Sequence, residues 1–444
     1  MGKEIINVGV LGFGTVGSGT AQILMNQAQL LRERSGVGIR LRRICDRNIA
    51  GPRGLDVPDG VLTDDVNALL DDPELDIFVE LIGGIEPARQ FILSAIEKGK
   101  HVVTANKALL ATCGHEIFQA AERRKVGLGF EASVGGGVPV IKAVREGLVA
   151  NSLHTIMGIM NGTANYILSR MTDEGLAFGD VLKEAQTLGY AEADPTFDIE
   201  GIDTAHKLAI LATLAFGTRV EMSDIYIEGI SSISPVDIEF ASGFGYNIKL
   251  LAIGRRIDGG LELRIHPTMI PKSHLLAQVG GAYNAFYLIG DAAGKIMLYG
   301  LGAGKMPTGS AVVADIVDIA RSLAMGIERL TLPAGVPFGA LSLLKKRSMD
   351  LISGRYYFRF SAVDRPGVLA RIAGVLGEFG ISIASVVQKG RRQGASVPIV
   401  MLTHEAQETR VRDALKIIDD TDVALDKTVV IRIEDLTAIE DNAV

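Results

Sequence analysis

The strongest constraint on the fold is a glycine-rich turn near the start of the chain. Residues 5–11 form a β-branched run typical of a buried parallel strand, and the turn GFGTVG follows at once at 12–17. A helix is expected from residue 15 to about residue 31. In a dinucleotide-binding fold the first glycine makes the tight turn, the second admits the pyrophosphate, and the third lets the helix pack on the strand. We therefore expect these six residues to contact a cofactor: Gly12, Phe13, Gly14, Thr15, Val16 and Gly17.

Strand-like and helix-like segments alternate along the next part of the chain. The expected strands lie at 39–45, 77–82, 101–104 and 126–132, and the expected helices at 87–98 and 113–124. This order is typical of a doubly wound α/β sheet of the Rossmann type. Thr104 and Lys107 follow one of these strands, at the sheet edge where such folds bind ligands, so they are candidates for cofactor contact. A single lysine at such a position can equally face solvent.

The end of the second strand leaves the choice of cofactor open. Asp46 could accept hydrogen bonds from a ribose 2′-hydroxyl, which favours NAD. Three arginines could instead pair with a 2′-phosphate, which favours NADP: Arg43, Arg47 and Arg53. We favour NADP, with Arg47 as its contact, and keep NAD as the alternative. A solvated loop would explain the arginines equally well.

An acidic loop leads into a helix at 189–207, which reads GYAEADPTFDIEGIDTAHK. Asp203 and Lys207 are four residues apart, so a helix places them on one face. Glu192 precedes them in a stretch whose proline and acidic residues indicate a loop. Three ionisable groups could therefore converge here. The alternative is an ordinary surface ion pair at the start of a helix.

A second glycine-rich segment, EASVGGGVP at 131–139, follows the last strand of the first module. Consecutive glycines let the backbone turn sharply and could bare its carbonyl groups. Together with Glu131, these oxygens could hold a hard monovalent cation. A plain crossover between two domains is the alternative.

These segments together resemble the homoserine dehydrogenase family, which interconverts L-aspartate 4-semialdehyde and L-homoserine. The resemblance rests on GFGTVG at 12–17, TANKALLA at 104–111, EASVGGGVP at 131–139, GIMNGTANYIL at 158–168, the 189–207 stretch and GLGAG at 300–304. It implies an NAD(P)-dependent oxidoreductase that acts on a CH–OH group in threonine, methionine and isoleucine biosynthesis.

The resemblance also implies roles for individual residues. Lys207 would be the proton donor and acceptor at the substrate oxygen, with Lys107 as a second catalytic lysine. Glu192 and Asp203 would hold the substrate amino group, and Gly302 would be a later cofactor contact.

A sodium site is implied as well. In the family a glutamate and three backbone carbonyls bind sodium at the hinge between domains, and the matching residues are Glu131, Val134, Gly136 and Val138.

The middle of the chain predicts an α+β module with a mixed sheet that backs the site and pairs subunits. Strands are expected at 224–230, 246–255, 262–269 and 286–290, and a long apolar helix at 310–325. His266 and His274 lack a third residue at ligand spacing and are interpreted as structural or exposed. The expected domains are a nucleotide-binding domain at 1–135 plus about 306–345, a substrate-binding and dimerisation domain at 136–305, a linker at 346–354, and a third domain at 355–438.

The last module reads as a ferredoxin-like βαββαβ unit. Strands are expected at 356–363, 381–388, 396–403 and 426–433, helices at 368–379 and 407–418, and a turn at 391–394. The turn DRPGVL at 364–369 resembles that of an ACT domain, a small-ligand sensor of amino-acid enzymes. Threonine is the effector that the family suggests. An ACT fold that only pairs subunits is the alternative.

Composition limits the partners. The formal net charge is −7 and 48% of residues are hydrophobic, so the chain offers no basic surface for nucleic acid. No apolar run is long enough to cross a bilayer, and Cys45 and Cys113 are interpreted as buried thiols in a reducing compartment. We expect a cytoplasmic homo-oligomer, a dimer or a tetramer. Another dehydrogenase of a small amino or oxo acid, and a non-catalytic nucleotide and amino-acid sensor, remain alternative functions.

Overall fold

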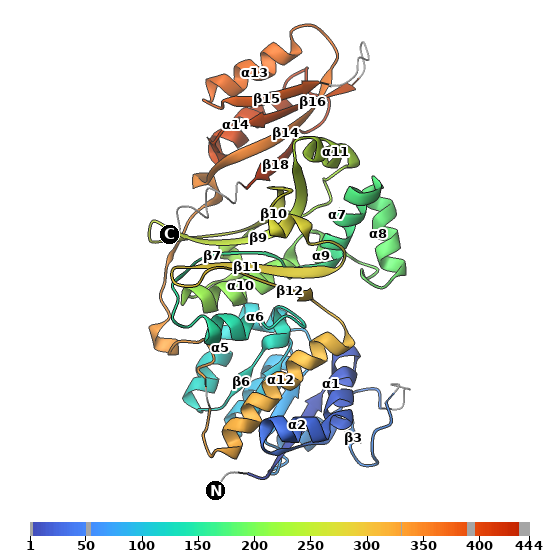
Figure 1. The fold of residues 1–444 in the computed structure, drawn as a ribbon, viewed down its shortest axis with the longest axis vertical. Coiled ribbons are helices and arrows are strands. Elements are labelled where there is room, and N and C mark those ends of the chain that lie inside the picture. Colours follow the sequence, from blue (N-terminus) through green and yellow to red (C-terminus); the bar gives the residue numbers. More distant parts are fainter. Residues whose placement is uncertain (1–2, 50–54, 330, 389–395, 435–444) are drawn as a thin grey trace. The chain divides into compact units, whose positions relative to one another are not determined.

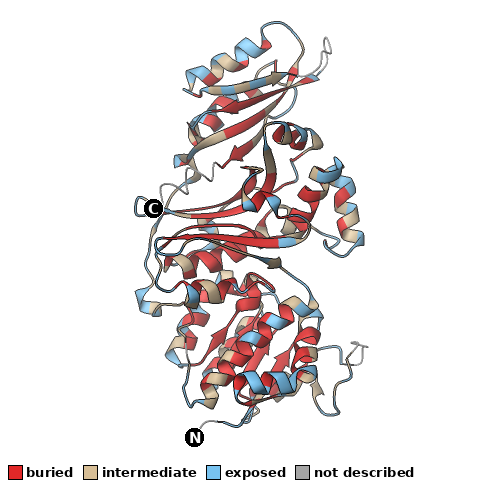
Figure 2. Ribbon diagram, in the orientation of Figure 1, coloured by how far each residue is buried: buried red, intermediate tan, exposed pale blue. Residues whose placement is uncertain are grey.

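The computed structural model describes residues 3–49, 55–329, 331–388 and 396–434 (Figure 1). The chain forms two compact units. The first comprises Met1–Ile156, Ala205–Asp224 and Asn284–Leu344, and the second comprises Met157–Thr204, Ile225–Tyr283 and Lys345–Val444. In both units the sheet strands are largely buried (Figure 2).

The first unit is built on a six-stranded parallel sheet in the order β3-β2-β1-β4-β5-β6. Its strands are β1 (Ile5–Leu11), β2 (Gly38–Cys45), β3 (Leu62–Thr63), β4 (Ile77–Glu80), β5 (His101–Thr104) and β6 (Leu128–Gly129). The chain reverses its direction of winding between β1 and β4, which is the switch point where such sheets bind ligands. This arrangement confirms the predicted Rossmann-type fold.

Helices cover the parallel sheet. They are α1 (Thr15–Asn26), α2 (Ala28–Ser35), α3 (Asn67–Leu70), α4 (Ala88–Glu97), α5 (Lys107–Arg123) and α12 (Lys305–Ala324). Two glycines let α1 and α12 approach closely, because a Cβ atom on Gly309 would lie 2.9 Å from the carbonyl carbon of Gly19. The segment near residue 310 thus packs against α1 in the first unit.

Several expected boundaries were wrong. The helix expected at 15–31 is interrupted at Gln27, whose φ of −114° and ψ of 20° lie outside the helical range. The strand expected at 126–132 is only the two-residue β6, because the backbone winds into a 3-10 helix at Glu131–Ser133. Cys45 is buried as predicted, but Cys113 is partly exposed.

Two further strands, β7 (Leu153–Ile159) and β12 (Gly294–Leu301), were not predicted. They are neighbours of β11 (Tyr283–Gly290) in the order β12-β11-β7. The helix α10 (Ile202–Phe216) begins one residue before Asp203, as the acidic motif predicts.

The second unit contains a mixed sheet in the order β9-β10-β18-β14-β16-β15. Its strands are β9 (Tyr246–Ile257), β10 (Gly260–Pro271), β14 (Ser353–Val363), β15 (Ile383–Gln388), β16 (Ser396–Thr403) and β18 (Val429–Ile433). The hairpin β9-β10 is antiparallel, whereas β18 runs parallel to β10 through Thr268↔Arg432 and Met269↔Ile433. The last module therefore extends the sheet of the middle module.

The last module has the predicted split topology. Its elements follow in the order β14, α13 (Val368–Glu378), β15, β16, α14 (Glu408–Asp419) and β18, and its sheet order is β18-β14-β16-β15 with antiparallel neighbours. Its core consists of buried side chains from the sheet and both helices, among them Phe358, Ile372 and Val411. The turn expected at 391–394 lies outside the described residues.

Four helices complete the second unit: α7 (Gly162–Glu174), α8 (Phe178–Thr187), α9 (Thr196–Ile199) and α11 (Pro235–Gly243). The strand expected at 224–230 shrinks to β8 (Tyr226–Ile227). Beyond it the backbone leaves the sheet to pair elsewhere, since the amide of Ile230 donates to the carbonyl of Ile199 at 2.8 Å.

Candidate cofactor and substrate residues

The turn at 12–17 has the backbone that a dinucleotide requires. Gly12 has a φ of +98°, and a Cβ atom there would lie 2.7 Å from the carbonyl oxygen of Leu81. A Cβ on Gly17 would lie 2.0 Å from the carbonyl oxygen of Gly12, so only glycine fits where α1 meets β1. At Gly14 no atom lies within 4 Å of such a Cβ, which leaves the turn open to a ligand. Phe13 is buried, and its amide donates to Asp46.

A cavity of about 550 Å³ adjoins this turn. Its lining includes Gly12, Gly14, Asp46, Arg47 and Gly83, all from the first unit. Because α1 begins at Thr15, the positive end of the helix dipole also faces this region. The space and its lining suit the phosphates and ribose of a dinucleotide.

The carboxylate of Asp46 is tied to the backbone on both sides. Its Oδ2 accepts from the amide of Phe13 at 2.6 Å, and its Oδ1 accepts from the amide of Asn48 at 2.9 Å. Arg47 lies beside it in the cavity lining, whereas Arg53 is outside the described residues. Arg43 donates to the carbonyl of Gly60 at 3.2 Å.

The end of β5 is held by a buried network that the sequence did not reveal. The hydroxyl of Thr104 donates to Glu80 at 2.7 Å, and Glu80 also accepts from the amides of Ile82 and Gly83 at 2.8 and 3.1 Å. Thr104 is thus occupied in fixing the neighbouring turn. Lys107 follows as the first, partly exposed residue of α5.

The 131–139 segment wraps around a buried carboxylate. Glu131 accepts from the amides of Ile141 and Lys142, each at 2.8 Å, and its own amide donates to Asp315 at 2.8 Å. Burial raises the pKa of Glu131, while the two amide hydrogen bonds oppose that shift. Burial, aided by the charge of Glu131, raises the pKa of Asp315 to about 7.

Gly136 and Gly302 pack against each other in the first unit. Gly136 has a φ of +59°, and a Cβ on it would lie 2.1 Å from the carbonyl oxygen of Gly302. A Cβ on Gly302 would in turn lie 2.0 Å from the side chain of Asn284. Close packing therefore explains why glycine stands at both positions. A cofactor contact at Gly302 stays a prediction.

Helix α10 carries the two central residues of the acidic motif. Asp203 lies in its first turn, in the second unit, and Lys207 lies one turn later, in the first. Both are buried, at 3% and 7% exposure. A surface ion pair, the alternative considered from the sequence, is wrong because neither side chain is at the surface.

Within the second unit Asp203 has a neighbour that the sequence analysis missed. The side-chain amide of Asn161 donates to Asp203 at 2.9 Å and to Asp198 at 2.7 Å. Glu192 is exposed, and its backbone carbonyl accepts from the side-chain amide of Gln186 at 3.1 Å. An asparagine directly before a helix is a recognisable capping signal, so the pattern could have drawn attention to Asn161.

His266 is fully buried in a polar network rather than exposed, with its ring nitrogens 2.7 Å from Arg264 and 2.9 Å from Thr268. Among the described residues no group of three histidine, cysteine, aspartate or glutamate side chains could hold a metal ion. The helices of the described ranges include none that is long and apolar enough to cross a membrane.

Three family models match the chain in succession. The NAD binding domain of homoserine dehydrogenase matches residues 12–131, the homoserine dehydrogenase domain matches 139–317, and the ACT domain matches 356–422. The homoserine dehydrogenase of Pseudomonas aeruginosa is 46% identical over 432 residues, which are 97% of this chain and 99% of the relative. That of Neisseria gonorrhoeae is 47% identical over 436 residues, with 97% and 99% covered.

Solved structures of homoserine dehydrogenases are similar to this chain over almost its full length. The crystal structure of a homoserine dehydrogenase from Thiobacillus denitrificans superimposes with a TM-score of 0.92 at 49% identity, over 98% of this chain and 99% of the other. A structure of the Staphylococcus aureus enzyme gives a TM-score of 0.74 at 34% identity, over 97% and 99%.

Fold and site together define an oxidoreductase that uses a nicotinamide cofactor on a small-molecule substrate and carries an ACT domain. More specifically, the chain belongs to the homoserine dehydrogenase family.

Proposed function

We propose that the chain interconverts L-homoserine and L-aspartate 4-semialdehyde with Lys207 as the acid and base. The observation that carries this assignment is a buried lysine on α10, one turn after a buried aspartate. A nicotinamide nucleotide, when bound, would supply or accept the hydride. When an aldehyde carbon is reduced, negative charge grows on its oxygen, and a lysine ammonium can both stabilise that charge and donate a proton to it.

Lys107 is proposed as the second catalytic lysine. It begins α5 at the carboxyl end of β5, the edge at which doubly wound sheets bind their ligands. The Thr104–Glu80 hydrogen bond and the capping of α5 by Asn106 fix the backbone on which Lys107 stands. A cation here would interact with the cofactor and the substrate oxygen.

Asp203 and Glu192 are proposed to hold the substrate ammonium group. Asp203 is buried and hydrogen-bonded, so its position is defined, whereas Glu192 stands on an exposed loop. A carboxylate can bind a substrate ammonium group through charge-assisted hydrogen bonds.

NADP is the proposed cofactor, with NAD as the alternative. Arg47 lines the cavity next to the glycine turn, where a 2′-phosphate would need a cation. The carboxylate of Asp46 accepts one backbone amide on each oxygen and keeps room for a ribose hydroxyl, which is why NAD stays the alternative.

A structural sodium ion is proposed at Glu131 and the carbonyls of Val134, Gly136 and Val138. The donor set fits, because oxygen ligands suit a hard cation and Glu131 supplies one negative charge. In the described part of the chain the carbonyls of Val134 and Gly136 accept no backbone hydrogen bond, whereas that of Val138 accepts from Val140 at 2.8 Å. A bound cation would also favour the ionised form of this buried carboxyl group.

The ACT domain is proposed to sense threonine, the end product of the pathway that also leads to methionine and isoleucine. The turn at 364–367 is held by ion pairs from Arg365 and Arg371 to Asp422, next to the start of α13. We also propose a cytoplasmic homodimer or homotetramer, and the domain division at 1–135 with 306–345, 136–305 and 355–438.

The test is the absorbance of reduced nicotinamide while the purified protein oxidises L-homoserine with NADP, repeated with NAD and with threonine added. Growth of the band, faster with NADP and slowed by threonine, is expected. The Lys207→Ala variant should bind NADP normally and lose turnover by about 10² to 10⁴-fold. Near-normal turnover in that variant would remove Lys207 from its role.

A further inference from the structure

Residues 226–237, which we call the connecting segment, run from β8 into the first turn of α11 within the second unit. Its first two residues pair with β10 of the middle module, through Arg264↔Tyr226 and Ile265↔Ile227. The side chains that hold its two ends, however, belong to the ACT domain. The connecting segment is therefore shared by both modules of this unit.

Arg432 of β18 holds the first end of the connecting segment. Its guanidinium donates to Glu228 at 2.7 Å and lies 5.2 Å from the ring centre of Tyr226. The same guanidinium donates to both oxygens of Glu408 on α14, at 3.0 and 2.5 Å. A two-bond pair of this kind fixes the orientation of an arginine. The ACT domain thus determines where Glu228 finds its partner.

Two residues of β14 hold the other end. Asp237 is fully buried and accepts from the hydroxyl of Tyr357 at 3.0 Å and from Arg359 at 2.6 and 3.0 Å. Asp237 also completes the capping box that Ser234 forms at the start of α11. The ACT domain therefore holds the first turn of α11 as well as β8.

The middle of the connecting segment packs against the backbone that leads to Asp203. A Cβ atom on Gly229 would lie 2.6 Å from the carbonyl oxygen of Ile199 and 2.7 Å from the Cα of Glu200. The amide of Ile230, which is fully buried, donates to the carbonyl of Ile199 at 2.8 Å. Because these contacts join backbone to backbone, a side-chain rotation cannot absorb a shift of the connecting segment.

We propose that the ACT domain positions the 196–203 stretch through the connecting segment, with Glu228 as a positioning residue. The proposal rests on the proposed role of Asp203 in binding the substrate. It gives the ACT domain a continuous route to a substrate residue within one unit. If the contacts served only to attach the ACT domain, their loss would lower stability and leave the 196–203 stretch unchanged.

Glu228→Ala tests the proposal because it cuts the route at one point. The side chain of Glu228 is 30% exposed, and Arg432 keeps its pair with Glu408, so the variant should fold. Amide hydrogen exchange in peptides from 196–203 should become roughly tenfold faster, since a hydrogen bond to a charged group is lost. The KM for L-homoserine should rise roughly three- to tenfold, and the KM for NADP should stay unchanged.

Tyr357→Phe cuts the route at its other end. It removes one hydrogen bond to Asp237, while Arg359 keeps the carboxylate paired. We expect the same changes as in Glu228→Ala, but smaller ones.

Glu434→Gln is the matched control. It breaks ion pairs of the same sheet junction, but these lead to Arg255 of β9 and Arg264 of β10 rather than to the connecting segment. This variant should lower the thermal midpoint more than Glu228→Ala does. The exchange of 196–203 under native conditions and the KM for L-homoserine should stay at the wild-type values.

The two readouts separate this inference from the proposed function. If Glu228→Ala leaves both the exchange of 196–203 and the KM unchanged, the inference is overturned. It is also overturned if Glu434→Gln speeds the exchange by the same factor, because the effect is then a general loss of stability. Faster exchange in Glu228→Ala with an unchanged KM would support the positioning and show that the proposed role of Asp203 is wrong.

Discussion

Two clusters of charged side chains in the second unit are built in opposite ways. At the junction of β10 and β18, Glu434 pairs with Arg255 at 2.7 Å and with Arg264 at 2.6 Å. At the start of α7, by contrast, Asp198 and Asp203 share the neutral amide of Asn161. In the first, balanced cluster a carboxylate pairs with guanidinium groups, whereas in the second two carboxylates share one neutral donor.

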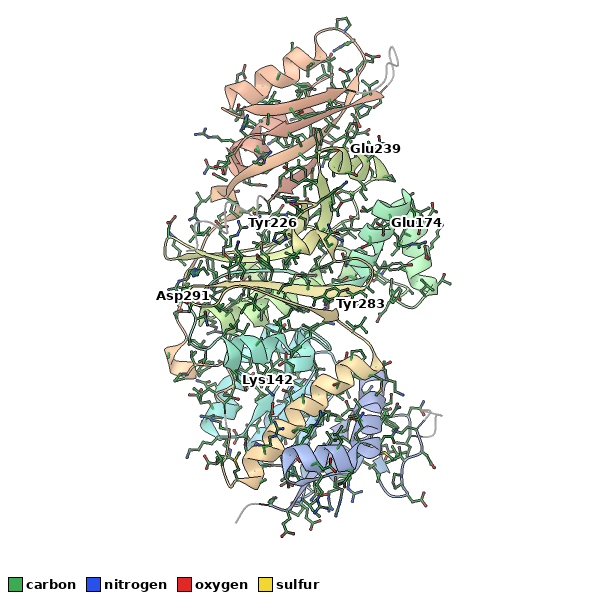
Figure 3. All side chains as sticks on the ribbon, in the orientation of Figure 1. Lys142, Glu174, Tyr226, Glu239, Tyr283 and Asp291 are labelled. Atoms are coloured by element: carbon green, nitrogen blue, oxygen red, sulfur yellow. The ribbon has the colours of Figure 1, made fainter. Side chains whose placement is uncertain are left out.

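The balanced cluster continues along β18. Arg432 pairs with Glu228 at 2.7 Å and with Glu408 at 2.5 Å, and its guanidinium lies 5.2 Å from the ring centre of Tyr226. Tyr226 is labelled in Figure 3. Every charge here has a partner within the chain, which suits a junction that holds the ACT domain to the middle module.

This difference makes it possible to separate effects on the stability of the fold from effects on the recognition of a ligand. Breaking a balanced pair leaves a buried charge without its partner and destabilises the fold. Removing one of two like charges relieves repulsion but takes away part of what attracts a cationic ligand. The two clusters should therefore respond to isosteric substitutions in opposite ways.

Among the variants of these two clusters, Asp203→Asn should have the largest effect on activity. The kcat/KM for L-homoserine should fall by about a hundredfold, because a hydrogen-bonded charge partner of the substrate is removed. The thermal midpoint should stay the same or rise, since one of two neighbouring negative charges is gone. Steady-state kinetics and thermal unfolding check the two parts, and a large drop in the midpoint would mean that the charge stabilises the fold.

Glu434→Gln should have the largest effect on stability. It leaves Arg255 and Arg264 buried without their partner, so the free energy of unfolding should fall by about 3–5 kcal/mol in urea titrations. Glu405→Gln, at an exposed glutamate of the same module, is the control and should be neutral. An equal loss of unfolding free energy in Glu434→Gln and Glu405→Gln would show that the ion pairs of Glu434 do not stabilise the fold.

The carboxylate of Glu434 should also make the free energy of unfolding depend on pH in the acid range. Burial opposes ionisation, but Arg255 and Arg264 hold the pKa of Glu434 well below its ordinary value of 4.5. The unfolded state therefore binds the proton first, so the contribution of Glu434 is complete above about pH 4.5 and is lost as the pH falls further. The difference in unfolding free energy between wild type and Glu434→Gln should shrink in acid.

The buried ammonium group of Lys249 should have a smaller effect on the free energy of unfolding, at alkaline pH. Its ammonium donates to Asn165 at 3.1 Å and to the carbonyl of Val279 at 2.6 Å, and burial lowers its pKa from 10.5 to about 8. Between these pH values the unfolded state binds more protons, so the free energy of unfolding should rise with pH. Lys249→Met should flatten this slope, and an unchanged slope would assign it to other groups.

Glu174→Ala should have the smallest effect. Glu174 pairs with Arg170 at 2.6 Å on the surface of α7, and its side chain is 46% exposed (Figure 3). An exposed pair of this spacing stabilises by less than about 0.5 kcal/mol. A loss in the urea titration as large as that of Glu434→Gln would erase the contrast between buried and exposed pairs.

Local patterns predicted much of the fold. The glycine turn at 12–17, the start of α10 and the split topology of the last module all follow from short-range rules about glycine, helix faces and alternation. The two-residue β6 and the break at Gln27 depend on tertiary contacts and single dihedral angles, which periodicity does not record.

The candidate site was predictable only in part. Asp203 and Lys207 follow from their spacing on one helix, and both are indeed buried. Asn161 lies 42 positions before Asp203, and Glu434 lies 170 positions after Arg264, so neither contact has a local signature. Long-range pairing of charges is decided by how the sheet and helices assemble.

The most direct test of the central claim is the kcat/KM of the wild-type protein for L-homoserine and for 4-hydroxybutyrate with NADP. If Asp203 and Glu192 bind the substrate ammonium group as proposed, L-homoserine should be preferred by at least about a hundredfold. Equal values for the two substrates would show that these carboxylates do not recognise the substrate amino group.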